Sequence, residues 1–147
     1  MKTLLFAVLI LPQFAFAALN GTWTGWAYWR YQGQGPKCFA QMKFSENPEK
    51  FILKGGLIDC DVVYMETDKR EFTKDANGEL ILDGEVAGAW SVDGAVSTYK
   101  WEEQYNENTV VHVNMRVEGG HMDYKEQWIE SDGSLLYDIE GRLFQGQ

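Results

Sequence analysis

Histidine, cysteine and proline are scarce in this chain of 147 residues, with two, two and three copies respectively. The histidines, His112 and His121, have no set of convergent ligands around them, so we expect no metal site. The sequence also lacks a Ser-His-Asp or Cys-His arrangement, a phosphate-binding glycine loop and a dinucleotide fingerprint. These absences exclude the common triad hydrolases and nucleotide-binding classes, and we expect no cofactor.

Basic residues are also few. Thirteen Lys and Arg stand against 22 Asp and Glu, for a net charge of −9. Phosphate backbones require a basic surface, so this balance argues against a nucleic-acid partner. It also disfavours binding to anionic membranes, and it favours solubility without indicating a specific partner.

Long apolar runs are absent except at the N-terminus, where residues 4–11 follow Lys2. This run is too short to span a bilayer, which needs roughly 20 residues. It is followed by Ala15-Phe16-Ala17, a small-x-small cleavage pattern. We predict a secretory signal peptide over residues 1–17 and one domain over residues 18–147, secreted or periplasmic. The alternative is a buried N-terminal helix.

The two cysteines, Cys38 and Cys60, form an even pair without C-x-x-C spacing. In an exported protein such a pair is most simply a structural disulfide. In the chain-entropy model, closing this loop stabilises the folded state by about 3 kcal/mol.

Helical periodicity is missing after the predicted signal peptide, so we expect no substantial helix there. Alternating apolar and polar residues, interrupted by turn dipeptides, indicate short strands instead. We predict strands near 21–31, 37–45, 51–58, 60–67, 70–75, 79–82, 85–92, 95–105, 109–118, 121–130 and 134–144. About eight to ten strands with one apolar face favour an all-β, antiparallel up-and-down barrel.

The last three strands can be paired residue by residue. A hairpin turn at Gly119-Gly120 sets four inward pairs: Val117 with Met122, Met115 with Tyr124, Val113 with Glu126, and Val111 with Trp128. A turn at Asp132-Gly133 then pairs Trp128 with Tyr137 and Glu126 with Ile139. The outward face matches Asp123 with Arg142 and Lys125 with Glu140, and such opposite charges support the register.

Two earlier hairpins complete the inner wall. A turn at Asp93-Gly94 pairs Trp90 with Ser97, Gly88 with Tyr99, and Val86 with Trp101. A three-residue loop over residues 106–108 then sets which face of the strand near 95–105 points inward, so that the aromatic residues of this strand are buried. The inward side chains are then Tyr99, Trp101, Glu103 and Tyr105.

The alternation also bears on membrane insertion. A membrane barrel turns its apolar face to lipid, yet the apolar face here carries Glu103 and Glu126. The other face carries mid-strand charges such as Lys125 and Arg142. Either orientation would place charges in lipid, so we expect a barrel that is not membrane-embedded.

The mature chain begins with a Gly21-Thr22-Trp23 motif at the start of the first predicted strand. This G-x-W resembles the opening signature of the calycins, which include lipocalins, fatty-acid-binding proteins and avidins. The resemblance implies a β-barrel with an internal ligand cavity and does not assign a subfamily. The arginine that covers the Trp in such proteins would correspond to Arg142, although the register above points Arg142 outward.

Glu103 and Glu126 are the strongest candidates for a functional role, because both are predicted to face the barrel interior. A buried carboxylate has a raised pKa unless it is paired, and it needs hydrogen-bond donors. Three interpretations remain open: a polar lining near a wet mouth, a contact to a ligand, and an acid–base pair in an enzyme. The predicted binding residues are Trp90, Tyr99, Trp101, Glu103, Tyr124, Glu126, Trp128 and Tyr137.

The sequence therefore predicts a lipocalin-like binding protein that holds a small apolar or aromatic molecule in its barrel. An enzyme that uses Glu103 and Glu126 is one alternative. The other is an interaction or inhibitor protein with a filled barrel and a protein partner. The first strand favours an interaction protein, because it carries aromatic residues on both faces. Trp23 and Trp29 lie on one face, and Trp26 and Tyr28 lie on the other.

Overall fold

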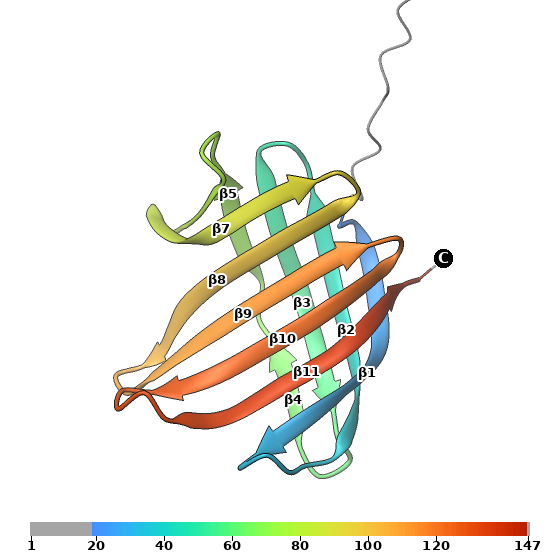
Figure 1. Ribbon diagram of the computed structural model, residues 1–147, viewed down its shortest axis with the longest axis vertical. Helices are drawn as coiled ribbons and strands as arrows, with labels where there is room; N and C mark the ends of the chain where they lie inside the picture. The colour runs from blue at the N-terminus through green and yellow to red at the C-terminus, as the bar shows by residue number, and fades with distance from the viewer. Residues whose placement is uncertain (1–18, 147) are drawn as a thin grey trace, which may run out of the picture.

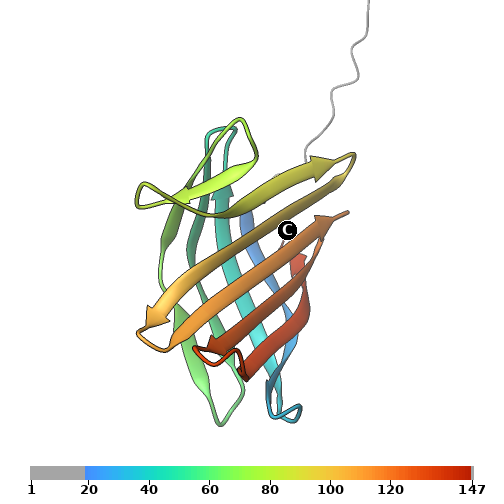
Figure 2. The same ribbon diagram turned by 60° about the vertical axis from the view of Figure 1, so that its left-hand side comes forward.

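The computed structural model describes residues 19–146, and their regular structure consists of antiparallel β-strands (Figures 1 and 2). The predicted signal peptide lies outside the described residues. The strands are β1 (Gly21–Tyr31), β2 (Lys37–Glu46), β3 (Lys50–Asp59), β4 (Tyr64–Thr67), β5 (Arg70–Lys74), β6 (Glu79–Leu82), β7 (Glu85–Asp93), β8 (Val96–Asn106), β9 (Thr109–Glu118), β10 (His121–Glu130) and β11 (Leu135–Gln145). The predicted all-β fold is confirmed. Residues 19–146 contain no helix long and apolar enough to cross a membrane.

The strands close into a barrel. Neighbours in sequence pair from β5 through to β11, and β11 then pairs with β1, β1 with β2, and β2 with β3. Both β4 and β5 pair with β3, β5 along its first half and β4 along its second. Ten strands thus form the ring, and β4 extends it at one end. This closure leaves few exposed sheet edges.

The register of the last three strands agrees with the prediction at each pair tested. Val113 lies opposite Glu126, and Glu126 lies opposite Ile139. On the outer face, Arg142 Nε donates to Asp123 Oδ1 at 2.7 Å and thereby lowers the pKa of Asp123. Trp23 is buried inside the barrel, so Arg142 does not provide the arginine cover that the calycin resemblance implies.

The register between β7 and β8 was predicted wrongly by two residues. Trp90 pairs with Tyr99, and Gly88 pairs with Trp101. Gly94, with φ of 59°, takes the first position of the turn, as glycine does in type II′ hairpins, so Asp93 pairs with Val96. A shift of two residues leaves the same side chains on the same face.

The loop after β8 is also shorter than predicted. Asn106 pairs with Thr109 across a two-residue turn, which alone would reverse the faces of β8. A bulge between Gln104 and Asn106 restores the alternation, because it adds one unpaired residue. Tyr99, Trp101 and Glu103 therefore face inward as predicted, while Tyr105 is 64% exposed.

Aromatic side chains fill one half of the barrel. The Phe51 ring is fully buried and stacks against Phe44, Phe72 and Tyr99, with centroids 5.8, 5.4 and 4.9 Å away. Trp101 lies 5.8 Å from the same ring and borders this cluster on the side of the other half. We refer to this group as the aromatic core. Its buried, stacked rings give this half of the barrel a closely packed core.

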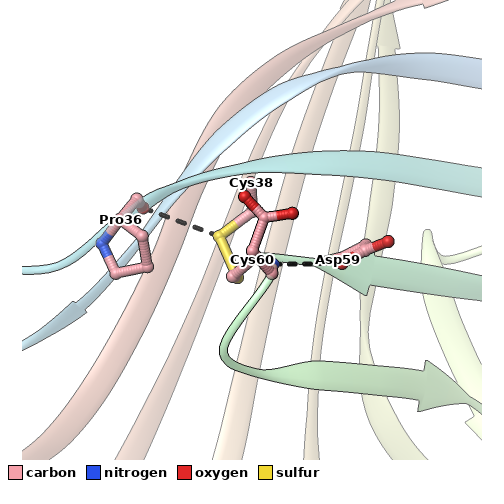
Figure 3. Close-up of a disulfide and its surroundings, with 5 residues drawn as sticks. Pro36, Cys38, Asp59 and Cys60 are labelled. Atoms are coloured by element: carbon pink, nitrogen blue, oxygen red, sulfur yellow. Dashed lines mark hydrogen bonds between the residues drawn. A yellow bond between two sulfur atoms is a disulfide. The ribbon is translucent and has the colours of Figure 1, made fainter.

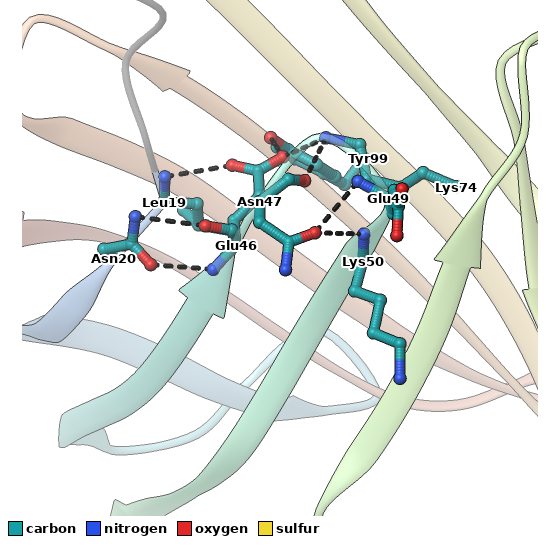
Figure 4. A network of polar contacts seen from close by, with 8 residues as sticks. All are labelled: Leu19, Asn20, Glu46, Asn47, Glu49, Lys50, Lys74 and Tyr99. Atoms are coloured by element: carbon teal, nitrogen blue, oxygen red, sulfur yellow. Dashed lines mark hydrogen bonds and ion pairs between the residues drawn. The ribbon is translucent and has the colours of Figure 1, made fainter.

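A polar network lies beside the aromatic core, where β2 and β3 are joined (Figure 4). The Glu46 carboxylate accepts from Lys74 Nζ at 2.7 Å, from Tyr99 Oη at 2.6 Å and from the backbone N of Leu19 at 3.1 Å. Lys74 also lies 4.2 Å from the centroid of the Trp90 ring. These bonds tie β2, β5, β8 and the start of the described chain together and close this end of the barrel.

The predicted disulfide joins Cys38 in β2 to Cys60 at the end of β3, at a Cα–Cα distance of 4.1 Å (Figure 3). Both residues are buried. Cys60 begins the short connection to β4, and its amide donates to the carbonyl of Val63 at 2.9 Å. The disulfide therefore anchors the hairpin that carries β4. It is also compatible with an oxidising, extracellular or periplasmic location.

Candidate functional site

The barrel wall is interrupted between β4 and β8. The pairing of β8 with β7 ends at Trp101. Within residues 19–146, residues 102–106 therefore have a β-strand neighbour only on the β9 side. On the other side of the gap, β4 pairs with β3 and with no other strand of the described chain. Backbone hydrogen bonds thus do not close the wall here, and side chains decide what occupies the opening.

A cavity of about 350 Å³ enters the barrel through this interruption. We call it the side cavity. Its inner wall is formed by buried residues of several strands, and its mouth by residues 66–68 and 103–105. The lining consists of Leu53, Ile58, Met65, Glu66, Thr67, Asp68, Arg70, Trp101, Glu103, Gln104, Tyr105, Val111, Val113, Tyr124, Glu126, Trp128 and Ile139.

Glu126 is the charged group on the inner wall of the side cavity, and only 9% of its surface is exposed. Tyr124 Oη donates to one carboxylate oxygen, and Trp128 Nε1 donates to the other at 2.5 Å. Burial raises the pKa of Glu126, the two hydrogen bonds oppose that change, and the nearby charge of Glu103 raises the pKa further. No basic side chain of residues 19–146 pairs with this carboxylate.

Glu103 differs from Glu126 because it has a cationic partner. Arg70 Nε, at the start of β5, donates to Glu103 Oε1 at 2.6 Å across the end of the interruption that lies next to β5. Both side chains are about 28–29% exposed, so the ion pair is partly solvated. The two carboxylates thus have separate environments, one neutralised at the mouth and one held inside by neutral donors.

Three aromatic rings pack together at the side cavity. The Trp128 ring stacks on Tyr137, with centroids 4.9 Å apart and planes 25° apart. Tyr105 meets the same ring edge-on at 4.5 Å. Because Trp128 also donates to Glu126, its indole is held at both its face and its nitrogen. This arrangement fixes the carboxylate and an aromatic surface relative to each other.

The eight residues predicted from the sequence divide into three groups. Five line the side cavity: Trp101, Glu103, Tyr124, Glu126 and Trp128. Tyr137 lies behind Trp128. Tyr99 and Trp90 lie apart from the cavity, because the first belongs to the aromatic core and the second packs against Lys74.

Some residues of the site were not predicted. Arg70 and Met65 come from the two short strands whose position around β3 the sequence does not reveal. Tyr105 was expected inside the barrel, and it lies at the cavity mouth because of the bulge in β8. Arg70 lies in a predicted strand that carries few apolar residues, which is a signal that could have drawn attention to it. The alternation of residues does not show which side chain Arg70 contacts.

The outside of the barrel carries a second feature. Trp26 and Tyr28 of β1, Phe39 of β2 and Phe144 of β11 are between 36% and 56% exposed. Trp26 and Phe39 are paired across the two strands, with ring centroids 6.1 Å apart. We call these four residues the outer aromatic surface. Large exposed aromatic side chains in a group are typical of interaction sites.

No protein-family model matches this chain, and no curated protein matches it. The closed antiparallel barrel and the Gly21-Thr22-Trp23 start of β1 are consistent with a calycin-like fold. A barrel of this kind does not by itself indicate a function, which depends on the sites that it carries.

Proposed function

We propose that this protein is a secreted or periplasmic binding protein that holds a small, mainly apolar or aromatic molecule in the side cavity. The observation that carries the proposal is a cavity through the barrel wall with a buried carboxylate on its inner surface. Small-molecule sites are usually concave and mainly apolar, with a few polar groups that orient the ligand. Glu126, Tyr124 and Trp128 would serve as those groups.

The division of the barrel supports the proposal. The aromatic core packs one half solidly, so its rigidity holds the walls of the other half in place. Trp101 belongs to both halves, since it packs against Phe51 and lines the cavity. A preformed site of this kind binds without a large ordering cost.

A second candidate is a protein-interaction module that uses the outer aromatic surface. The exposed Trp26 and Phe144 favour it. An enzyme that uses Glu103 and Glu126 as acid and base gains less support, because Arg70 already pairs with Glu103. The two binding candidates differ in which face of the barrel contacts the partner molecule.

Filling the side cavity should abolish binding of an apolar probe. Val111 lines the cavity between Glu103 and Trp128, whereas its neighbour Val110 is not part of the lining. We expect Val111→Phe to weaken binding of the neutral dye N-phenyl-1-naphthylamine by about tenfold or more, because a phenyl ring takes up the volume that the dye needs. The measurement is a fluorescence titration of the dye.

Val110→Phe is the matched control, and its affinity for the dye should stay within about twofold of the original chain. If both variants bind the dye like the original chain, the side cavity is not the binding site.

A further inference from the structure

The side cavity favours a positively charged ligand, because acidic side chains outnumber basic ones in its lining. Four carboxylates line it, those of Glu66, Asp68, Glu103 and Glu126, against the single guanidinium of Arg70. Arg70 is already engaged by Glu103 at 2.6 Å. An anionic molecule, such as a fatty acid, would meet uncompensated negative charge on its way in, and like charges brought together cost binding free energy.

Glu126 retains capacity to accept hydrogen bonds. A carboxylate offers about four acceptor sites, and the described residues supply two donors, Tyr124 Oη and Trp128 Nε1. Each carboxylate oxygen accepts one of these bonds, so each keeps a further acceptor site. A buried carboxylate is stabilised further by each donor that it gains, so a ligand that brings N–H groups would stabilise Glu126.

The surrounding rings suit the same chemistry. Trp101 and Trp128 line the cavity, and Tyr105 stands at its mouth. An ammonium group is attracted to the face of an aromatic ring, most strongly to Trp, and more so where water is excluded. Aromatic rings beside a carboxylate therefore offer an ammonium both a counter-ion and a stabilising wall.

We propose, on the basis of the binding function proposed above, that the side cavity selects an organic ammonium with a flat apolar body, with Glu126 as the counter-ion. The ammonium donates to the free acceptor sites of Glu126, and the apolar body lies against Trp101 and Trp128. Hydrogen bonds between charged groups are roughly twice as strong as neutral ones, which gives the site its preference for cations over neutral molecules of the same shape.

The electrostatics of Glu126 agree with this assignment. Its pKa is raised mainly by burial, which means that the ionised form lacks a stabilising charge inside the protein. A bound cation would supply that charge. Glu103 and the phenols of Tyr124 and Tyr137 interact electrostatically with Glu126. Burial raises the pKa of Tyr124 far above its usual range, so it stays a neutral donor.

The test compares three probes of similar shape and different charge. Tryptamine is a cation, indole-3-ethanol is neutral, and indole-3-acetate is an anion. Each is used to displace N-phenyl-1-naphthylamine from the protein at pH 7.5. We expect tryptamine to bind about tenfold or more tightly than indole-3-ethanol, and indole-3-acetate to bind more weakly than both.

Glu126→Gln should bring tryptamine and indole-3-ethanol within about twofold of each other, because the shape is kept and the charge is removed. Glu66→Gln is the matched control, since it removes an exposed carboxylate from the mouth and should keep most of the preference. A cooperative urea unfolding transition, followed by tryptophan fluorescence, reports that Glu126→Gln is folded, and the dye affinity of each variant is measured first so that displacement converts to probe affinity.

The outcomes separate the two proposals. If the original chain binds the dye but does not distinguish tryptamine from indole-3-ethanol, the cation preference is wrong and the binding function stands. If the preference for tryptamine survives in Glu126→Gln, Glu126 is not the counter-ion. If the dye itself does not bind to the original chain, the binding function fails, and the cation preference fails with it.

Discussion

Replacing Phe51 by Ala should lower the free energy of unfolding by about 4 kcal/mol. The ring is fully buried and packs against four other aromatic rings, so its removal leaves a cavity that rigid neighbours cannot collapse into. Urea denaturation followed by tryptophan fluorescence measures the change. Since small domains have only about 5–15 kcal/mol in total, the variant should be close to its limit.

Phe144→Ala provides the comparison for that experiment. It deletes the same ring from the outer aromatic surface, where 56% of the side chain is already exposed. Its effect on the free energy of unfolding should stay within about 0.5 kcal/mol. Equal losses for the two variants would mean that the aromatic core does not hold the barrel together. Phe51→Leu, which keeps much of the volume, should fall between them.

Removing the disulfide should have the second-largest effect. With Cys38 and Cys60 both replaced by Ala, the loop of 22 residues is no longer closed in the unfolded chain, and the free energy of unfolding should fall by about 3 kcal/mol. Urea denaturation of the double variant measures the total. A change below about 1 kcal/mol would show that the link contributes little.

The same variant tests the role of the disulfide at the side cavity. Because β4 pairs only with β3 within the described chain, its backbone amides should lose protection from hydrogen exchange more than those of β10. Uniform loss across the barrel would instead indicate a purely global effect. A loosened β4 should also weaken dye binding, since Met65 and Glu66 lie along the cavity.

The sequence predicts the second half of the barrel well for a definite reason. The hairpins of β9, β10 and β11 are joined by short glycine-containing turns, and each strand has a single apolar face. Any slip by one residue would have buried Arg116 or Lys125. Slips by two residues keep the faces, which is why the wrong pairing of Trp90 with Ser97 did not disturb the predicted inner wall.

The interruption between β4 and β8 could not be predicted, because it depends on which strand lies beside which. The alternation in residues 60–75 indicates strand, but it does not say that β4 and β5 share one partner. Tyr99 shows the same limit. Its inward direction was predicted, whereas its bond to Glu46 depends on β2 meeting β8 at one end of the barrel.

Glu126 is the residue for which sequence and geometry agree most closely. Its carboxylate interrupts an apolar face of β10, which marks it as a polar group inside the barrel. The structure adds what the sequence lacks, namely that two neighbours on the same face, Tyr124 and Trp128, donate to it. A residue that breaks the local pattern in this way is a frequent sign of a functional site.

The central claim is that the barrel binds a small molecule in the side cavity, and the indole N–H signals of the six tryptophans test it most directly. In a ¹H–¹⁵N NMR titration with N-phenyl-1-naphthylamine, the signals of Trp101 and Trp128 should shift, because both side chains line the cavity. The signal of Trp26, on the outer aromatic surface, should stay in place. A shift of Trp26 with Trp101 and Trp128 unchanged would contradict the claim and place the binding site on the outside of the barrel.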